Sequence, residues 1–94
     1  MEIVHFAYKD EEKDIGVSTY KGDLYVYESL CEGLASDGKL DDSYFLFPIT
    51  RTEYEMIKSA EACCNLLTTA KAESRTRLHL VCDYNNDNQW FQYS

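Results

Sequence analysis

The sequence predicts an α+β fold, in which an antiparallel β-sheet carries one long and one short helix packed on one face. Short segments rich in Val, Ile, Tyr and Phe are separated by turn residues, and one long segment has apolar residues at helical spacing. No Pro/Gly/Ser-rich linker divides the 94 residues, so residues 1–94 are expected to form a single domain.

The N-terminal third predicts strands. Residues 2–8 (EIVHFAY) have apolar side chains on both faces, which is typical of an inner strand. The charged residues 9–14 (KDEEKD) predict a solvated loop. Residues 15–20 and 24–27 flank a Lys-Gly-Asp turn, so they predict a β-hairpin.

A short helix at about 28–36 is expected after this hairpin. Because apolar residues recur at helical spacing from Leu24 onward, a helix that begins at Asp23 is the alternative. Residues 36–43 (SDGKLDDS) have the chemistry of a turn, and residues 43–49 (SYFLFPI) predict a strand.

The clearest element is a helix over about 51–73. Thr50 and Glu53 have the spacing of a capping box, in which the two side chains satisfy free backbone N–H groups at the start of a helix. An apolar stripe at helical period follows the box. Its members are Met56, Ile57, Ala60, Cys63, Cys64, Leu67 and Ala70.

Two strands, 77–84 and 89–94, are expected at the C-terminal end, joined by a turn. Asp83, Asn85 and Asp87 have the spacing of the first oxygen ligands in an EF-hand calcium loop. However, the glycine and the final glutamate of such a loop are missing, and both flanks predict strands rather than helices. Asn and Asp favour tight turns, so the stretch predicts a hairpin tip and no metal site.

The cysteines predict neither disulfides nor zinc. Cys63 and Cys64 are neighbours, no CxxC pair exists, and the acidic N-terminus does not resemble a secretory signal. All four cysteines are therefore expected to be reduced thiols in a cytoplasmic protein. No apolar run is long enough to span a membrane, and no phosphate-binding, nucleophile or metalloprotease motif is present. We expect no cofactor, no metal and no enzymatic activity.

The charge and the tyrosines point to a basic protein partner. The net charge is −8, which argues against direct binding to nucleic acid or to anionic membranes. Many of the eight tyrosines stand beside acids, and such a surface suits Arg- and Lys-rich proteins. We therefore expect a small acidic inhibitor of a basic, nucleic-acid-cleaving protein, and specifically an immunity protein against a bacterial nuclease toxin. The alternatives are a phage-encoded, anti-CRISPR-type inhibitor of a defence complex, or a homo-oligomeric interaction module.

Three patches are candidates for this partner surface. The first combines acids with an aromatic side chain, the second is purely acidic, and the third contains a Trp that faces away from its neighbour Phe91. The alternative for this Trp is that it packs as core against a helix. The patches are Asp37, Asp41, Asp42 and Tyr44; Asp10, Glu11, Glu12 and Asp14; and Asp87 with Trp90.

Overall fold

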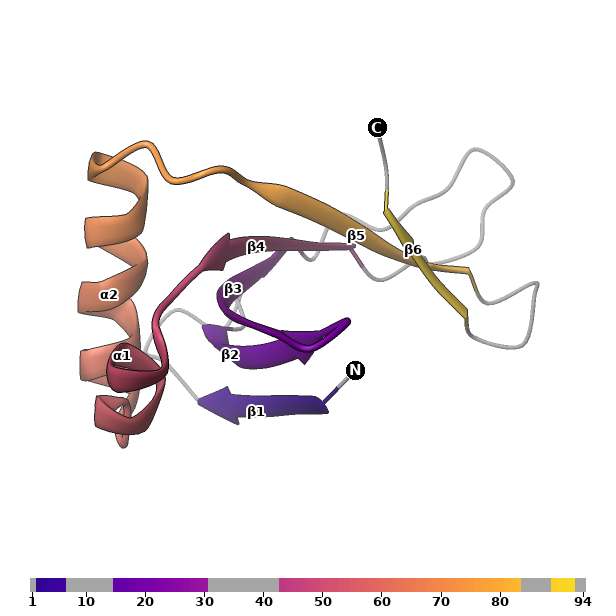
Figure 1. Cartoon of the computed structure of the whole chain (residues 1–94). Coiled ribbons are helices and arrows are strands. Elements are labelled where there is room, and N and C mark those ends of the chain that lie inside the picture. Colours follow the sequence, from indigo (N-terminus) through magenta and orange to yellow (C-terminus); the bar gives the residue numbers. More distant parts are fainter. Residues whose placement is uncertain (1, 7–14, 31–42, 84–88, 93–94) are drawn as a thin grey trace.

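The computed structural model describes residues 2–6, 15–30, 43–83 and 89–92. It confirms the α+β fold class, with a six-stranded antiparallel sheet in the order β1-β2-β3-β4-β5-β6 and helices at one face (Figure 1). The strands are β1 (Glu2–Phe6), β2 (Ile15–Tyr20), β3 (Asp23–Leu30), β4 (Ser43–Pro48), β5 (Leu78–Asp83) and β6 (Gln89–Gln92). The helices are α1 (Arg51–Met56) and α2 (Ala60–Ala72).

The β2–β3 hairpin is confirmed. Lys21 and Gly22 both have positive φ angles, 50° and 85°, which the type I′ turn of a two-residue hairpin requires. The alternative of a helix from Asp23 is wrong, and so is the helical assignment of residues 28–30, because β3 continues to Leu30. This strand pairs with β2 on one side and β4 on the other, and these ladders outweigh the local helical spacing.

The expectation that the first strand is an inner strand is wrong. Among the strands that the structure describes, β1 pairs with β2 alone and comes first in the strand order, and four of its five residues are exposed. In β1, therefore, the presence of apolar residues on both faces of the strand did not mean that both faces are buried. Of the five residues of β1, Phe6 is the one that packs against the core beneath the helices.

The expected long helix is two helices. The capping box is present, since Glu53 N–H donates to Thr50 Oγ1 at 3.0 Å and Thr50 N–H donates to Glu53 Oε1 at 2.9 Å. The first helix ends at Met56, and Ile57 is extended. The Ser59 hydroxyl then accepts from the Ala62 N–H and begins α2, so a second N-cap interrupts the continuous apolar stripe.

The two C-terminal strands pair as expected, from Leu80 opposite Gln92 to Asp83 opposite Gln89. The predicted loop 9–14, residues 36–42 of the predicted turn 36–43 and the hairpin tip 85–88 lie outside the described residues, as do residues 31–36 of the expected short helix. Ser43, the last residue of that predicted turn, begins β4. In the described part of the chain, neither helix is long and apolar enough to cross a membrane.

The sheet has a separate apolar cluster on each face. The cluster beneath the helices joins the sheet to α2 and consists of Ile15, Val26, Phe47, Cys63, Leu67 and Ala70. The cluster on the opposite face has Tyr27, Leu46 and Leu80 at its centre. Around these lie the half-buried side chains of Tyr20, Tyr25, Tyr44, Leu78 and Trp90, and we call these eight residues the aromatic face.

Candidate partner-binding surface

Two residues from different predicted patches meet on the aromatic face. Tyr44 on β4 and Trp90 on β6 are both half-buried, and their ring centroids lie 5.1 Å apart with the planes tilted by 51°. Tyr44 also meets Tyr27 edge to face, with centroids 5.2 Å apart. Trp90 therefore packs on the face opposite the helices, and not against a helix.

Strand pairing explains why the two rings touch. Tyr44 lies opposite Leu80 on β5, and Leu80 lies opposite Gln92 on β6. Trp90 is two residues from Gln92, so it lies on the same face of β6 as Gln92. Leu80 is fully buried, so the two rings cover it from the strands on either side. Because each ring holds the other in place, little side-chain freedom remains to be lost when a partner binds.

Gly16 extends the aromatic face toward the edge of the sheet, and it was not among the predicted site residues. A Cβ at this position would lie 2.6 Å from the Tyr27 ring, because that ring crosses over β2 at the glycine. The Tyr27 hydroxyl thereby comes within 3.3 Å of His5 Nδ1 on β1. A glycine inside an alternating strand was the signal for this close approach.

The Tyr44–Trp90 contact lies beside the ends of segment 31–42, which holds four acids, and of segment 84–88, which holds Asp87. Leu30, at the end of β3, pairs with Ser43, which in turn pairs with Val81 on β5, so both segments begin and end at the same end of the sheet. Tyr44 is the second residue after segment 31–42, and Trp90 is the second after segment 84–88. The first and third predicted patches are therefore attached side by side.

The excess negative charge is concentrated outside the described residues. These hold eight of the 17 Asp and Glu residues and six of the nine Lys and Arg residues, a net charge of −2 against −8 for the chain. Of the predicted partner residues, only Tyr44 and Trp90 are described. The others lie outside the described residues: Asp10, Glu11, Glu12, Asp14, Asp37, Asp41, Asp42 and Asp87.

A serine–histidine contact lies on the helix-bearing side of β4 and β5. Ser43 Oγ is hydrogen-bonded to His79 Nε2, and the imidazole packs on Phe45 with ring centroids 4.6 Å apart. The Arg77 guanidinium lies 4.2 Å from the centre of the same Phe45 ring. Burial, helped by Arg77, lowers the pKa of His79 below its usual value, so the neutral imidazole is favoured.

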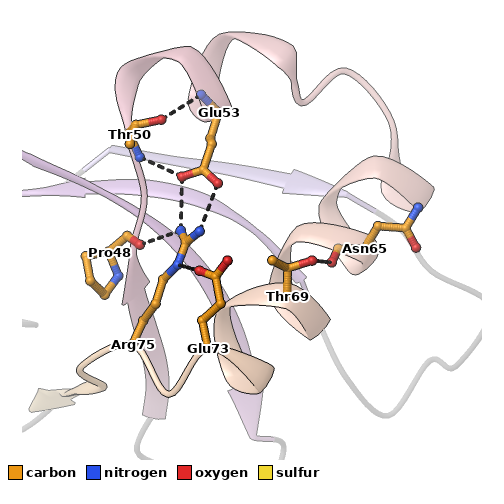
Figure 2. Close-up of polar contacts among 7 residues, drawn as sticks. All are labelled: Pro48, Thr50, Glu53, Asn65, Thr69, Glu73 and Arg75. Atoms are coloured by element: carbon orange, nitrogen blue, oxygen red, sulfur yellow. Dashed lines mark hydrogen bonds and ion pairs between the residues drawn. The ribbon is translucent and has the colours of Figure 1, made fainter.

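An arginine clamp, formed by Arg75 and its partners, locks the helices to the sheet (Figure 2). The guanidinium donates to both Glu53 carboxylate oxygens at 3.0 Å, to Glu73 at 2.8 Å and to the Pro48 carbonyl at 3.0 Å. These partners belong to the start of α1, the end of α2 and the end of β4. Hydrogen bonds from Arg75 lower the pKa of the Glu53 carboxyl group. Every group in this cluster already serves the fold, so the clamp is structural.

Cys63 and Cys64 behave as apolar side chains. Cys63 is fully buried, and this burial raises the pKa of its thiol to about 12, so it stays protonated. Cys64 beside it is half-buried, and both are free thiols. Within the described ranges, no group of three His, Cys, Asp or Glu residues could hold a metal ion.

Comparisons with known proteins identify no relative. No protein-family model matches the chain, and neither the curated proteins nor the solved structures contain a significant match. The functional interpretation therefore depends on the geometry and chemistry of the aromatic face.

Proposed function

We propose that this chain is a small acidic inhibitor that binds and neutralises a basic, nucleic-acid-cleaving protein, as an immunity protein does for a bacterial nuclease toxin. One observation carries the proposal. Tyr44 and Trp90 form a half-buried aromatic pair at the end of the sheet where the acidic segment 31–42 and the segment 84–88, which contains Asp87, are attached.

This arrangement suits a basic surface for two reasons. A nuclease must bind phosphate, so its active site is rich in Lys and Arg, and carboxylates can occupy the places of the phosphates. Aromatic rings add contact area and can receive a guanidinium group on their face. Tyr and Trp are also the residue types that most often dominate binding energy at protein interfaces. Acidic segments would steer the encounter, and the rings would hold the complex.

A phage-encoded inhibitor of a defence complex is the second candidate, because the same surface could cover a nucleic-acid channel. A mimic that copies nucleic acid over its whole surface would carry negative charge throughout. Here the described residues are nearly balanced in charge, and the excess of acids over bases lies in short segments between the strands. This distribution favours docking through one local patch, which is how an immunity protein would cover an active site.

Affinity capture followed by reconstitution tests the proposal. The tagged chain is incubated with lysate of its native cell or host, and retained proteins are compared after washes at low salt and at about 0.5 M salt. The expected result is one basic nuclease or toxin domain, retained at low salt, whose cleavage of nucleic acid falls to zero at one equivalent of added inhibitor. Cleavage that continues with the complex formed would contradict the proposal.

Variants then separate steering from anchoring. Replacing Asp41 and Asp42 with Asn should slow association with the purified nuclease and leave dissociation unchanged. Trp90→Ala should instead speed dissociation, with a loss of affinity on the order of tenfold or more. Met56→Ala is the matched control, because Met56 is 72% exposed and lies at the end of α1, away from the aromatic face. Equal losses of affinity in the Trp90→Ala and Met56→Ala variants would show that the interface does not include Trp90.

A further inference from the structure

A second polar cluster lies on the aromatic face, where β2 turns into β3. Tyr20 pairs with Asp23 across the two-residue turn, and Ser18 pairs with Tyr25. Side chains two residues apart on a strand share a face, so Ser18 lies on the face of Tyr20, and Asp23 on the face of Tyr25. Both tyrosines pack on the cluster opposite the helices. We call these four residues the hairpin site.

The polar groups of the hairpin site are not used by the fold. The Ser18 side chain is 2% exposed, yet its hydroxyl has no hydrogen-bond partner. Asp23 is exposed, and among the described residues neither its carboxylate nor the Tyr25 hydroxyl takes part in a hydrogen bond or ion pair. The Glu53 carboxylate of the arginine clamp, by contrast, is bonded through both oxygens. Buried polar groups are normally paired, so an unpaired one beside two further open acceptors points to a ligand.

The charge at the hairpin site favours a cation. Burial raises the pKa of the Tyr25 hydroxyl, and the negative charge of Asp23 and the neighbouring Tyr20 raise this pKa further. A place that resists a second negative charge attracts a positive one. The Lys21 ammonium already lies 5.3 Å from the centre of the Tyr20 ring. Lys21 and Asp23 form no ion pair in the described part of the chain, so the carboxylate is open to a cation from another molecule.

We propose that the hairpin site binds the guanidinium group of an arginine side chain, and that this arginine belongs to the basic partner. Guanidinium is a planar cation with five N–H donors, and the site offers carboxylate, phenol and hydroxyl oxygens as acceptors. Its flat faces can also stack on the half-buried tyrosine rings. A lysine ammonium group has three donors and no flat face, so it fits this site less well.

The identity of the partner rests on the proposed inhibitor function, whereas the chemistry of the ligand rests on the hairpin site alone. Tyr25 lies opposite Pro48 at the end of β4, and Tyr44 lies four residues earlier on that strand. The hairpin site and the Tyr44–Trp90 pair are therefore about 13 Å apart along the strand direction. A partner that covers the aromatic face would contact both.

Titration with small probes tests the site without any partner. N-acetyl-arginine methylamide, its lysine analogue and its neutral citrulline analogue are each added to the isotope-labelled full chain, and nuclear magnetic resonance follows the amide shifts. The arginine probe should shift the resonances of Ser18, Tyr20 and Tyr25, with a dissociation constant on the order of ten millimolar. The lysine probe should bind about threefold more weakly or less, and the citrulline probe should cause no shift. An arginine probe that binds no better than either analogue, or that causes no shift at about 100 mM, overturns the proposal.

Variants show whether the probe binds at the proposed residues. Asp23→Asn should weaken binding of the arginine probe about threefold or more, because a charged acceptor is lost. Ser18→Ala should also weaken binding, and it should not lower the free energy of unfolding, because the Ser18 hydroxyl has no hydrogen bond to lose. Glu55→Gln is the matched control, since it removes the same charge from an exposed position on α1 and should leave binding unchanged. Wild-type affinity in Asp23→Asn or Ser18→Ala, or equal losses in Asp23→Asn and Glu55→Gln, overturns the proposal.

The probe experiment and the capture experiment can fail separately. If the arginine probe binds at the hairpin site but no nuclease is captured and silenced, the guanidinium site stands and the inhibitor function is contradicted. If a nuclease is captured and silenced but the arginine probe does not bind, the inhibitor function stands and the guanidinium site is overturned.

Discussion

The two faces of the sheet solve the problem of burial with different side chains. Beneath the helices the buried contacts come from residues such as Val26, Phe47 and Leu67, which have no polar atoms in their side chains. On the opposite face they come from Tyr27 and its aromatic neighbours, and no helix residue belongs to that described cluster. The helix-bearing face is stabilised by packing of apolar side chains. The aromatic face combines such packing with the hydrogen-bonding groups of its Tyr and Trp side chains.

This difference between the two faces suggests that one face serves mainly stability and the other mainly recognition of a partner. A helix excludes water from the side chains beneath it, so aliphatic packing suffices there. A face without a helix keeps part of its surface exposed, and amphipathic rings can remain half-buried there at small cost. The helix-bearing face should therefore respond to truncation mainly with a loss of stability. The aromatic face should respond mainly with a loss of binding.

The largest expected effect is a loss of stability on truncation of the helix-bearing core. Leu67→Ala should lower the free energy of unfolding by about 2–5 kcal/mol, because a buried side chain is replaced by a cavity. Urea denaturation followed by circular dichroism measures this. Leu66→Ala is the control, since Leu66 is only partly buried on the same helix and should cost less. Equal losses would mean that this face is not a close-packed core.

The next effect concerns the arginine clamp, which supports the helix-bearing face. Arg75→Lys keeps the charge but loses the paired hydrogen bonds to Glu53, so the free energy of unfolding should fall by about 1–3 kcal/mol. Arg51→Lys should change it by less than about 0.5 kcal/mol, because Arg51 and Glu55 are exposed and 3.8 Å apart. Similar values for the two variants would show that the clamp is an ordinary surface ion pair.

A smaller effect tests the aromatic pair itself. A double-mutant cycle of Tyr44→Ala and Trp90→Ala should give a coupling free energy of about 0.5–1.5 kcal/mol, which is the usual range for two aromatic rings in contact. The cycle is measured by denaturation without any partner, so it does not depend on the proposed function. Additive losses would show that the rings do not support one another and would weaken the case for a pre-formed anchor.

The sequence predicted the elements better than their places in the sheet. Alternating apolar residues and the spacing of Thr50 and Glu53 are local signals, and they correctly predicted most strands and the start of α1. The edge position of β1 depends on which strands pair, which no local pattern contains. The break before Ser59 was missed because the apolar stripe continues across it.

The candidate site was predictable only in part, for the same reason. Tyr44 and Trp90 were each singled out from their neighbours in the sequence. Their contact depends on β5 lying between β4 and β6, and on Leu80 being buried between them. Gly16 was missed because its role arises from Tyr27, which lies on the neighbouring strand.

The smallest effect is a dependence of stability on pH, which distinguishes the Ser43–His79 contact from the rest of the helix-bearing side. Burial and Arg77 hold the pKa of His79 below its usual 6.5, so the folded state binds a proton less readily than the unfolded state. Its contribution to stability is therefore complete above pH 6.5 and is lost as the pH falls through the lower, folded pKa. Glu53, whose pKa is lowered from 4.5, contributes in the same direction only at more acidic pH. Melting temperatures between about pH 8 and pH 5 should fall for the wild type and fall less for His79→Asn. If the two slopes are equal, His79 takes up a proton in the folded protein as readily as in the unfolded chain, and burial beside Arg77 does not hold the imidazole neutral.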